Sequence, residues 1–115
     1  MTGNEYQTEV MRTAVSADLP IALKGAAILE GVMGLCGESG ECLELVKKRL
    51  FQGHKLDKRH LALELGDVAW YLAYAAHALG YDLETIMRMN VDKLWNRYPE
   101  GFDPKRSQKR QEGDI

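Results

Sequence analysis

Residues 57–80, DKRHLALELGDVAWYLAYAAHALG, decide the fold. Their apolar positions recur at alternating steps of four and three, the spacing of one face of an α-helix. Asp57 is placed to cap the start of this helix, and Gly80 to end it. The stretch therefore predicts a helix with a core-facing apolar stripe, formed by Leu61, Leu65, Val68, Leu72, Ala75 and Leu79.

Helical spacing continues on either side of this stretch, and no run alternates in the manner of a β-strand. The expected elements are a helix from about Glu5 to Val15, a connector from Ser16 to Pro20, a long helix from about Ala22 to just before Gly53, and a helix that follows Asp82 as its N-cap and ends at Tyr98, ahead of Pro99. This pattern predicts an all-α fold, a bundle-like protomer of four to five helices.

Each of these helices carries its own expected inward positions. They are Tyr6, Val10 and Met11 in the first helix, Ile28, Leu29, Val32, Leu35, Leu43, Val46 and Leu50 in the long one, and Leu83, Ile86, Met87 and Leu94 in the last. The polar stretch 104–115 has little to bury, so we expect a domain over 1–103 followed by a mobile tail.

The chain has 115 residues, of which 45% are hydrophobic. That is the composition of a folded protein and the length of one domain. A chain this short buries a limited core. We therefore expect it to pack in a homo-oligomer, a homodimer or homotetramer, in which an identical subunit supplies the missing core.

The net charge is −2, from 15 basic and 17 acidic residues. This balance argues against a protein that mainly neutralises nucleic-acid phosphates or an anionic membrane surface. The cations that follow the last helix, Lys105, Arg106, Lys109 and Arg110, form a charge run of the kind that is usually solvated. We expect no membrane partner, no stable nucleic-acid binding and a cytoplasmic location.

The long helix has a glycine at every third position, at Gly31, Gly34, Gly37 and Gly40. Each of them costs a helix interior about 0.5–1 kcal/mol relative to alanine. Close approach of a neighbouring helix and close approach of the backbone to a ligand explain such a run equally well.

Cys36 and Cys42 have no disulfide or metal spacing, and we expect reduced, mostly buried thiols.

Two pairs of carboxylates stand out, Glu38 with Glu41 and Glu64 with Asp67. Residues three apart on a helix lie on neighbouring parts of one face, so each pair can coordinate a cation from one side. Oxygen ligands favour a hard cation, and Mg²⁺ fits because it keeps waters and substrate phosphate oxygens as further ligands. The hypothesis is a Mg²⁺ site held by all four carboxylates.

Two other interpretations of these acids stay open. Acid pairs at this spacing also occur on solvent-exposed helix surfaces, where they bind no ligand. A di-iron carboxylate centre requires Glu-x-x-His motifs on two helices. Neither pair ends in histidine, and His54, His60 and His77 stand elsewhere, where we expect surface or boundary positions. The iron interpretation is therefore the weakest.

The last expected helix supplies opposite charge through Asn90, Lys93 and Arg97, which share one face. Beside a bound metal these residues are suited to holding phosphate, and arginine suits bidentate contact. The alternative is that the two cations lie along the margin of an apolar stripe. Lys48 is a weaker candidate for phosphate binding, because Glu44 and Lys48 also make an ordinary surface pair.

Three segments together resemble a known family. They are GLCGESGECLELVKK at 34–48, LALELGDVAWYLA at 61–73 and NVDKLWNRYPEGF at 90–102. In this order they are similar to the MazG-type branch of the all-α nucleoside triphosphate pyrophosphohydrolases. The signature of that branch is ExxE, a spacer, and ExxD, and here 22 residues separate Glu41 from Glu64. The resemblance runs from about Glu5 to Asp103.

The resemblance implies a homo-oligomeric enzyme that hydrolyses a nucleoside or deoxynucleoside triphosphate to the monophosphate and pyrophosphate. It implies Mg²⁺, with Mn²⁺ as a substitute, on Glu38, Glu41, Glu64 and Asp67, and phosphate or sugar contacts from Asn90, Lys93 and Arg97.

Further roles are hypotheses from the chemistry of the residues. Tyr71, or Trp70 beside it, is a candidate for stacking near the base or ribose. Either Glu41 or Glu38 is the expected catalytic base. The alternative function is a non-catalytic helical module that binds nucleotides or dimerises through the same surface.

Overall fold

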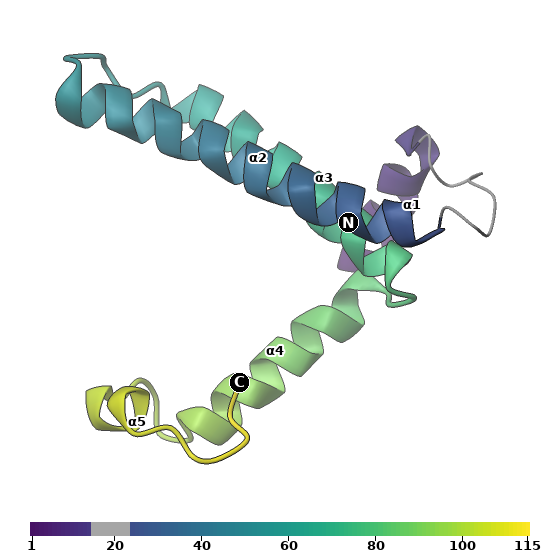
Figure 1. Cartoon of the computed structure of the whole chain (residues 1–115), viewed down its shortest axis with the longest axis vertical. Helices are drawn as coiled ribbons and strands as arrows, with labels where there is room; N and C mark the ends of the chain where they lie inside the picture. Colours follow the sequence, from purple (N-terminus) through teal and green to yellow (C-terminus); the bar gives the residue numbers. More distant parts are fainter. Residues whose placement is uncertain (15–23) are drawn as a thin grey trace. The chain divides into compact units, whose positions relative to one another are not determined.

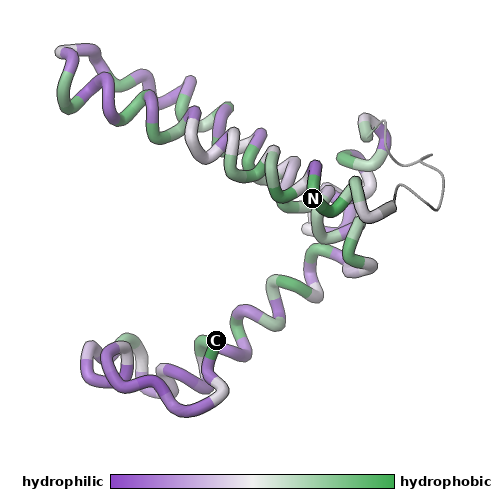
Figure 2. The backbone as a smooth tube through the Cα atoms, viewed as in Figure 1, coloured by the Kyte–Doolittle hydropathy of each residue, from purple (hydrophilic) through white to green (hydrophobic). Residues whose placement is uncertain are grey.

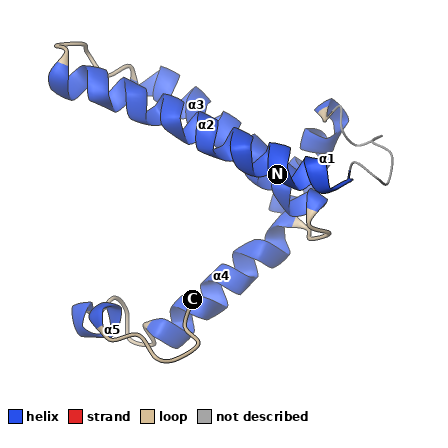
Figure 3. Cartoon of the chain, viewed as in Figure 1, coloured by secondary structure: helices blue, strands red, loops and turns tan. Residues whose placement is uncertain are grey.

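The computed structural model describes residues 1–14 and 24–115, and its regular structure is helical (Figure 3). The helices are α1 (Gly3–Thr13), α2 (Lys24–Phe51), α3 (Lys58–Ala78), α4 (Leu83–Arg97) and α5 (Pro104–Gln108). Over the described residues there is no strand, and Pro99 and Gly101 form an isolated bridge. The expected all-α fold is confirmed. None of these helices combines the length and the apolar character needed to cross a membrane.

The observed ends of the helices follow from their capping residues. Thr2 and Glu5 form a capping box, so α1 starts at Gly3, ahead of the expected start at Glu5. Asp57 caps α3 by accepting the backbone N–H groups of Arg59 and His60, each at 3.0 Å. Gly80, with φ +83°, follows the end of α3 as predicted. The helix α4 ends at Arg97, one residue before the predicted end.

The helix α1 ends at Thr13, with Ala14 in an extended conformation, so the predicted continuation to Val15 is wrong. The connector Ser16–Pro20 and the start of the long helix at Ala22 fall on residues that the structure does not describe.

The chain divides into two compact units, Met1–Leu83 and Glu84–Ile115. In the first unit α2 and α3 lie side by side and run in opposite directions, and α1 packs against α3 (Figure 1). The second unit contains the rest of α4, the short α5 and the segment 109–115.

Two glycines of α2 allow its close approach to α3. A Cβ on Gly31 would lie 2.9 Å from Ala75 Cβ and 3.0 Å from Ala75 Cα, and a Cβ on Gly34 would overlap the ring of Tyr71. Gly37 and Gly40 have open space where a Cβ would stand. Helix packing therefore explains the first two glycines of the run and leaves the other two unexplained.

The core of the first unit is small and lies where α1 meets α3. It is built on Val10, Ala73, Tyr74 and Leu83. Tyr74 donates a hydrogen bond to Glu30 on α2 at 3.0 Å, and burial together with this carboxylate raises the Tyr74 pKa to about 12. This hydroxyl therefore stays protonated and ties α3 to α2.

The buried Gln7 makes three hydrogen bonds within the first unit. Its Nε2 donates to Ala73 O and Tyr81 O, and its Oε1 accepts the backbone N–H of Leu83. One α1 side chain thus bonds to backbone groups of α3, of the turn that follows it and of the first residue of α4.

The predicted apolar stripe of α3 is wrong as a description of the core within one chain. Leu65 is 55% exposed, Leu72 39% and Leu79 52%, and of the predicted positions only Ala75 is buried. Residues of two adjacent lines of α3 face α2. Tyr71 lies against Gly34, and Tyr74 bonds to Glu30. Ala75, from the predicted stripe, lies against Gly31, so only part of that stripe faces α2.

Other predicted inward positions of α2 and α4 are also exposed in the described residues. These are Leu29, Val32, Leu43, Leu50, Met87 and Leu94. Apolar residues recur along α2 and α3 in Figure 2. Cys36 is exposed as well, so its predicted burial is wrong, whereas Cys42 is partly buried, and both are free thiols. A single chain therefore does not cover the apolar surface that its sequence pattern provides.

The polar stretch 104–115 contains more local structure than the predicted tail. Asp103 caps α5 by accepting the Lys105 backbone N–H, and Arg97 pairs with Asp114. The mobility of this stretch, and its separation from a domain over 1–103, remain predictions.

The two kinds of glycine in α2 give a matched test of helix packing. Gly34→Ala should lower the free energy of unfolding by about 1–3 kcal/mol, because the added methyl displaces Tyr71. Gly37→Ala, in open space, should raise it by up to about 1 kcal/mol. Urea denaturation of the two variants checks both values, and equal stability of the two would contradict the close approach at Gly34.

Candidate metal centre

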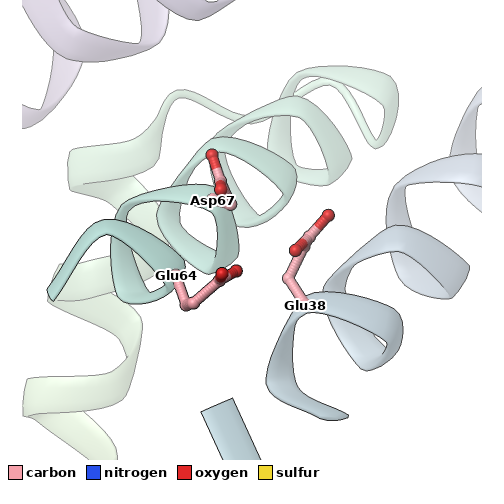
Figure 4. A group of neighbouring side chains, drawn as sticks. All are labelled: Glu38, Glu64 and Asp67. Atoms are coloured by element: carbon pink, nitrogen blue, oxygen red, sulfur yellow. The ribbon is translucent and has the colours of Figure 1, made fainter. Parts of the chain in front are cut away.

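Three carboxylates of the first unit converge at the α2–α3 contact (Figure 4). Glu38 extends from α2, and Glu64 and Asp67 extend from α3. One oxygen of each lies within 4.8 Å of the others. Glu38 and Glu64 are partly buried, and Asp67 is exposed. The structure thus brings together three of the four predicted metal ligands.

The register of the two helices explains this convergence. Gly34 lies against Tyr71, and the helices run in opposite directions. One turn further along α2 is Glu38, and one turn back along α3 is Asp67, so the two carboxylates face each other. The missing side chain at Gly34 therefore helps to set how closely the acids approach.

The charges of this group act on one another. Partial burial and the negative charges of Asp67, Glu64 and Glu41 raise the pKa of Glu38. Burial and the charge of Asp67 also raise the pKa of Tyr6, whose hydroxyl lies 3.4 Å from Gly66 O. Carboxylates held this close repel one another unless a cation or a proton intervenes. An all-oxygen donor set of this kind fits a hard divalent cation.

Glu41, the fourth predicted ligand, is exposed on α2 and is not a member of the converging group. It is near enough for its charge to contribute to the raised pKa of Glu38. Its predicted roles as ligand and as base stay predictions.

His60 is a neighbour of the site that the sequence argument left as a surface residue. It is exposed, as expected, but its Nε2 lies 2.8 Å from Glu64 Oε1. With Glu64 ionised, the ring N–H donates to the carboxylate. The spacing of four residues on one helix was the signal for this contact.

A hollow of about 400 Å³ opens beside the carboxylates. It is lined by Thr13, Glu38, Asp67, Trp70 and Tyr71. The Trp70 Nε1 donates to Thr13 Oγ1 at 2.9 Å, and the Trp70 and Tyr71 rings meet edge to face with centroids 5.0 Å apart. The predicted residue Tyr71 thus lines the same hollow as two of the acids, and Thr13 is a lining residue that sequence reasoning missed.

Lys48 takes part in the surface pairing that the sequence allowed as an alternative. Its Nζ lies 3.9 Å from Glu44 Oε1, and Lys47 Nζ lies 2.8 Å from Glu44 Oε2. The two lysines also lower the pKa of Glu44, mainly through the Lys47 hydrogen bond.

The remaining predicted residues, Asn90, Lys93 and Arg97, belong to the second unit. Asn90 and Lys93 are exposed. The guanidinium of Arg97 is bound to the carboxylate of Asp114. Their role toward phosphate stays a prediction.

Comparison with known proteins identifies a family match that spans both α2 and α3. The family model of the MazG nucleotide pyrophosphohydrolase domain matches residues 29–102, more than half of the chain. The Gene 37 protein of Mycobacterium phage L5 is 40% identical over 73 residues, which cover 60% of this chain and 64% of the phage protein. The chain thus spans slightly less than two thirds of that relative. No solved structure matches significantly.

The His60 contact predicts an effect on metal binding that does not depend on turnover. His60→Ala should weaken Mn²⁺ binding by about 10-fold or more, because the hydrogen bond that orients Glu64 is lost. His60→Gln should retain part of the affinity, because its amide can still donate. Calorimetric titration with Mn²⁺ measures both, and His77→Ala, exposed on the same helix, is the control. Equal affinities in all four proteins would show that His60 does not position the carboxylate.

Proposed function

The chain belongs to the MazG nucleotide pyrophosphohydrolase family, and from this premise we propose that it hydrolyses a nucleoside or deoxynucleoside triphosphate to the monophosphate and pyrophosphate, as nucleotide-pool clean-up requires. The observation that carries the proposal is the convergence of Glu38, Glu64 and Asp67 within the segment that matches the family. The hollow beside them has room for part of a nucleotide.

The metal in this proposal is Mg²⁺, with Mn²⁺ as a substitute. Glu38, Glu64 and Asp67 would hold it, with Glu41 as the further ligand that the signature assigns. The ion would neutralise phosphate oxygens and lower the pKa of a bound water. The mutual repulsion that raises the pKa of Glu38 supports a cation at this position, because a cation relieves it.

The protein also has to orient a water molecule and accept its proton. Glu41 is our first candidate and Glu38 the second. Glu41 is exposed and outside the converging group, which leaves its carboxylate available to a water molecule. Glu38 lines the hollow beside Asp67, so a water molecule in the hollow would also lie within its reach.

Substrate contacts are proposed for Tyr71 in the first unit and for Asn90, Lys93 and Arg97 in the second. Tyr71 and Trp70 give the hollow an aromatic wall next to Glu38 and Asp67, which suits a base or ribose. Lys93 and Arg97 suit phosphate oxygens through their charge and their N–H groups. Lys48 is a secondary candidate, because Glu44 already holds it.

We also propose that the working form is a homodimer or homotetramer. Leu29, Leu43, Leu65 and Leu79 are each more than half exposed in a single chain, and its buried core is small. Exposed apolar surface of this extent marks an interaction site. We also propose a cytoplasmic location, because nucleotide substrates are present there.

The function is tested by incubating the protein with a panel of nucleotides and Mg²⁺. Pyrophosphate and the monophosphate should appear in equal amounts. Asp67→Asn should reduce turnover by at least about 100-fold, because it removes a charged ligand from the site. Glu9→Gln, an exposed acid on α1, is the control and should act as the wild type.

Three results would count against this function. Release of orthophosphate would contradict cleavage between the α and β phosphorus atoms. Full activity of Asp67→Asn with an unchanged circular dichroism spectrum would contradict the metal site. Thermal stabilisation by nucleotide and Mg²⁺ with no turnover would favour the non-catalytic binding module.

The two candidate bases are separated by comparing Glu41→Gln with Glu38→Gln. Loss of the base should lower kcat by about 10²–10⁴-fold even at saturating Mn²⁺, whereas excess Mn²⁺ should restore most of the activity after loss of a ligand alone. We expect Glu41→Gln to show the first pattern and Glu38→Gln the second. Reversal of the two patterns would assign the base to Glu38.

The oligomer is tested by light scattering on the eluted protein. The mass should be two or four times that of one chain. Leu72→Lys, on the exposed apolar stripe of α3, should shift it toward the monomer, because a buried lysine at an interface is costly. Thr8→Lys, at an exposed position of α1, should not. A monomeric wild type at micromolar concentration would contradict the proposal.

A further inference from the structure

The second unit contains a hollow of about 1040 Å³, formed by α4, α5 and the segment 109–115. Within 84–115 its lining includes six cationic side chains: Lys93, Arg97, Lys105, Arg106, Lys109 and Arg110. The acidic residues of the lining are Asp92, Glu112 and Asp114. The hollow is thus a local positive region in a chain whose net charge is negative.

Arg97 is the cation of this hollow that the segment 109–115 binds directly. Its Nε donates to Asp114 Oδ2 at 2.8 Å, and its Nη2 donates to Asp114 Oδ1 at 2.5 Å and to Ile115 O at 3.1 Å. The guanidinium also lies 5.9 Å from the centre of the Tyr98 ring. The contact is bidentate, the arrangement in which arginine also binds phosphate.

This ion pair differs from an ordinary surface pair in its burial. The Arg97 side chain is 10% exposed and the Asp114 side chain 18%. The Arg97 hydrogen bond and charge lower the pKa of Asp114, with further contributions from Arg110 and Lys93. Three cations of the hollow therefore act on this one carboxylate.

Asp114 thus occupies the position that an anion would take in this hollow. A carboxylate and a phosphate offer arginine the same pair of oxygen acceptors, and a phosphate carries more negative charge. Lys93 and Arg97, the two cations proposed to bind substrate phosphate, are both among those that favour ionised Asp114. An anion in the hollow and Asp114 therefore compete for the same N–H groups.

We propose that the hollow of the second unit binds a polyphosphate anion and that Asp114 is its internal competitor, released from Arg97 when the anion binds. The proposal rests on the phosphate-binding role of Lys93 and Arg97 in the proposed function. The cations of α5 and of the segment that follows it, Lys105, Arg106, Lys109 and Arg110, then belong to the anion site and are not simply a solvated run.

Competition of this kind lowers the apparent affinity for the anion. The measured dissociation constant is the intrinsic constant divided by the fraction of molecules in which Arg97 is free. A substitution that weakens the pair raises this fraction and tightens binding. The competitor thereby favours ligands that bring several negative charges, because a single phosphate gains less from displacing a bidentate carboxylate.

Calorimetric titration of the full chain with inorganic tripolyphosphate, in EDTA and without nucleotide, tests this directly. Asp114→Asn should bind at least about fivefold more tightly than the wild type, because the competing charge is gone. Asp92→Asn is the matched control, since it removes one negative charge from the same lining. Arg97→Gln should bind more weakly than the wild type.

A second readout follows the competing segment itself. In ¹⁵N-edited NMR spectra of the wild type, the Gly113 and Asp114 amide signals should move toward random-coil positions as tripolyphosphate is added. Equal tightening in Asp114→Asn and Asp92→Asn would overturn the proposal, because charge alone would then explain the effect. Absence of binding to the wild type and to Asp114→Asn would overturn it as well, as would unmoved signals at saturation.

These outcomes are separate from those of the proposed function, because neither measurement requires metal, a nucleoside or turnover. If the protein releases pyrophosphate but Asp114→Asn and Asp92→Asn bind tripolyphosphate equally well, the proposed function stands. The proposal that Asp114 competes with the anion is then wrong.

Discussion

The close approach of α2 to α3 at Gly31 and Gly34 is the constraint on which the first unit depends. A Cβ at Gly31 would lie 3.0 Å from the Ala75 backbone, and the Tyr71 ring fills the space next to Gly34. Helices that meet through missing side chains come closer than usual, and residues one turn away are carried toward each other. Glu38 and Asp67 stand one turn from that contact, so the packing of two glycines sets the spacing of the acids.

The contact of α3 with α2 carries acidic groups as well as apolar ones. Glu64 is partly buried there and Asp67 is exposed, while Leu65 and Leu72 of the same helix are exposed. A partly buried carboxylate beside other carboxylates is unfavourable unless something compensates the charge. Local violations of packing rules of this kind are typical of functional sites.

Much of the fold could be predicted from one sequence, because it depends on local chemistry. Asp57 and Gly80 bound α3 through their own hydrogen bonding and backbone geometry, and the ExxE and ExxD pairs predicted an acidic site. Membership of the converging group could not be predicted. Glu41 has the same spacing from Glu38 as Asp67 has from Glu64, yet Asp67 joins the converging group and Glu41 does not. The difference lies in how each helix is rotated about its own axis, which the sequence does not reveal. The bidentate pairing of Arg97 with Asp114 joins residues that no periodicity relates.

The sequence by itself determined the helical class, the ends of α3 and the chemical character of the site, since these follow from backbone propensities, capping and residue type within a few positions. The tertiary structure decided which residues of α3 face α2, which carboxylates meet, and that His60 and Thr13 lie beside them. The reason is physical. Neighbouring residues of a helix differ by a rotation of only about 100° about its axis, so contacts with a second helix decide which of them face it.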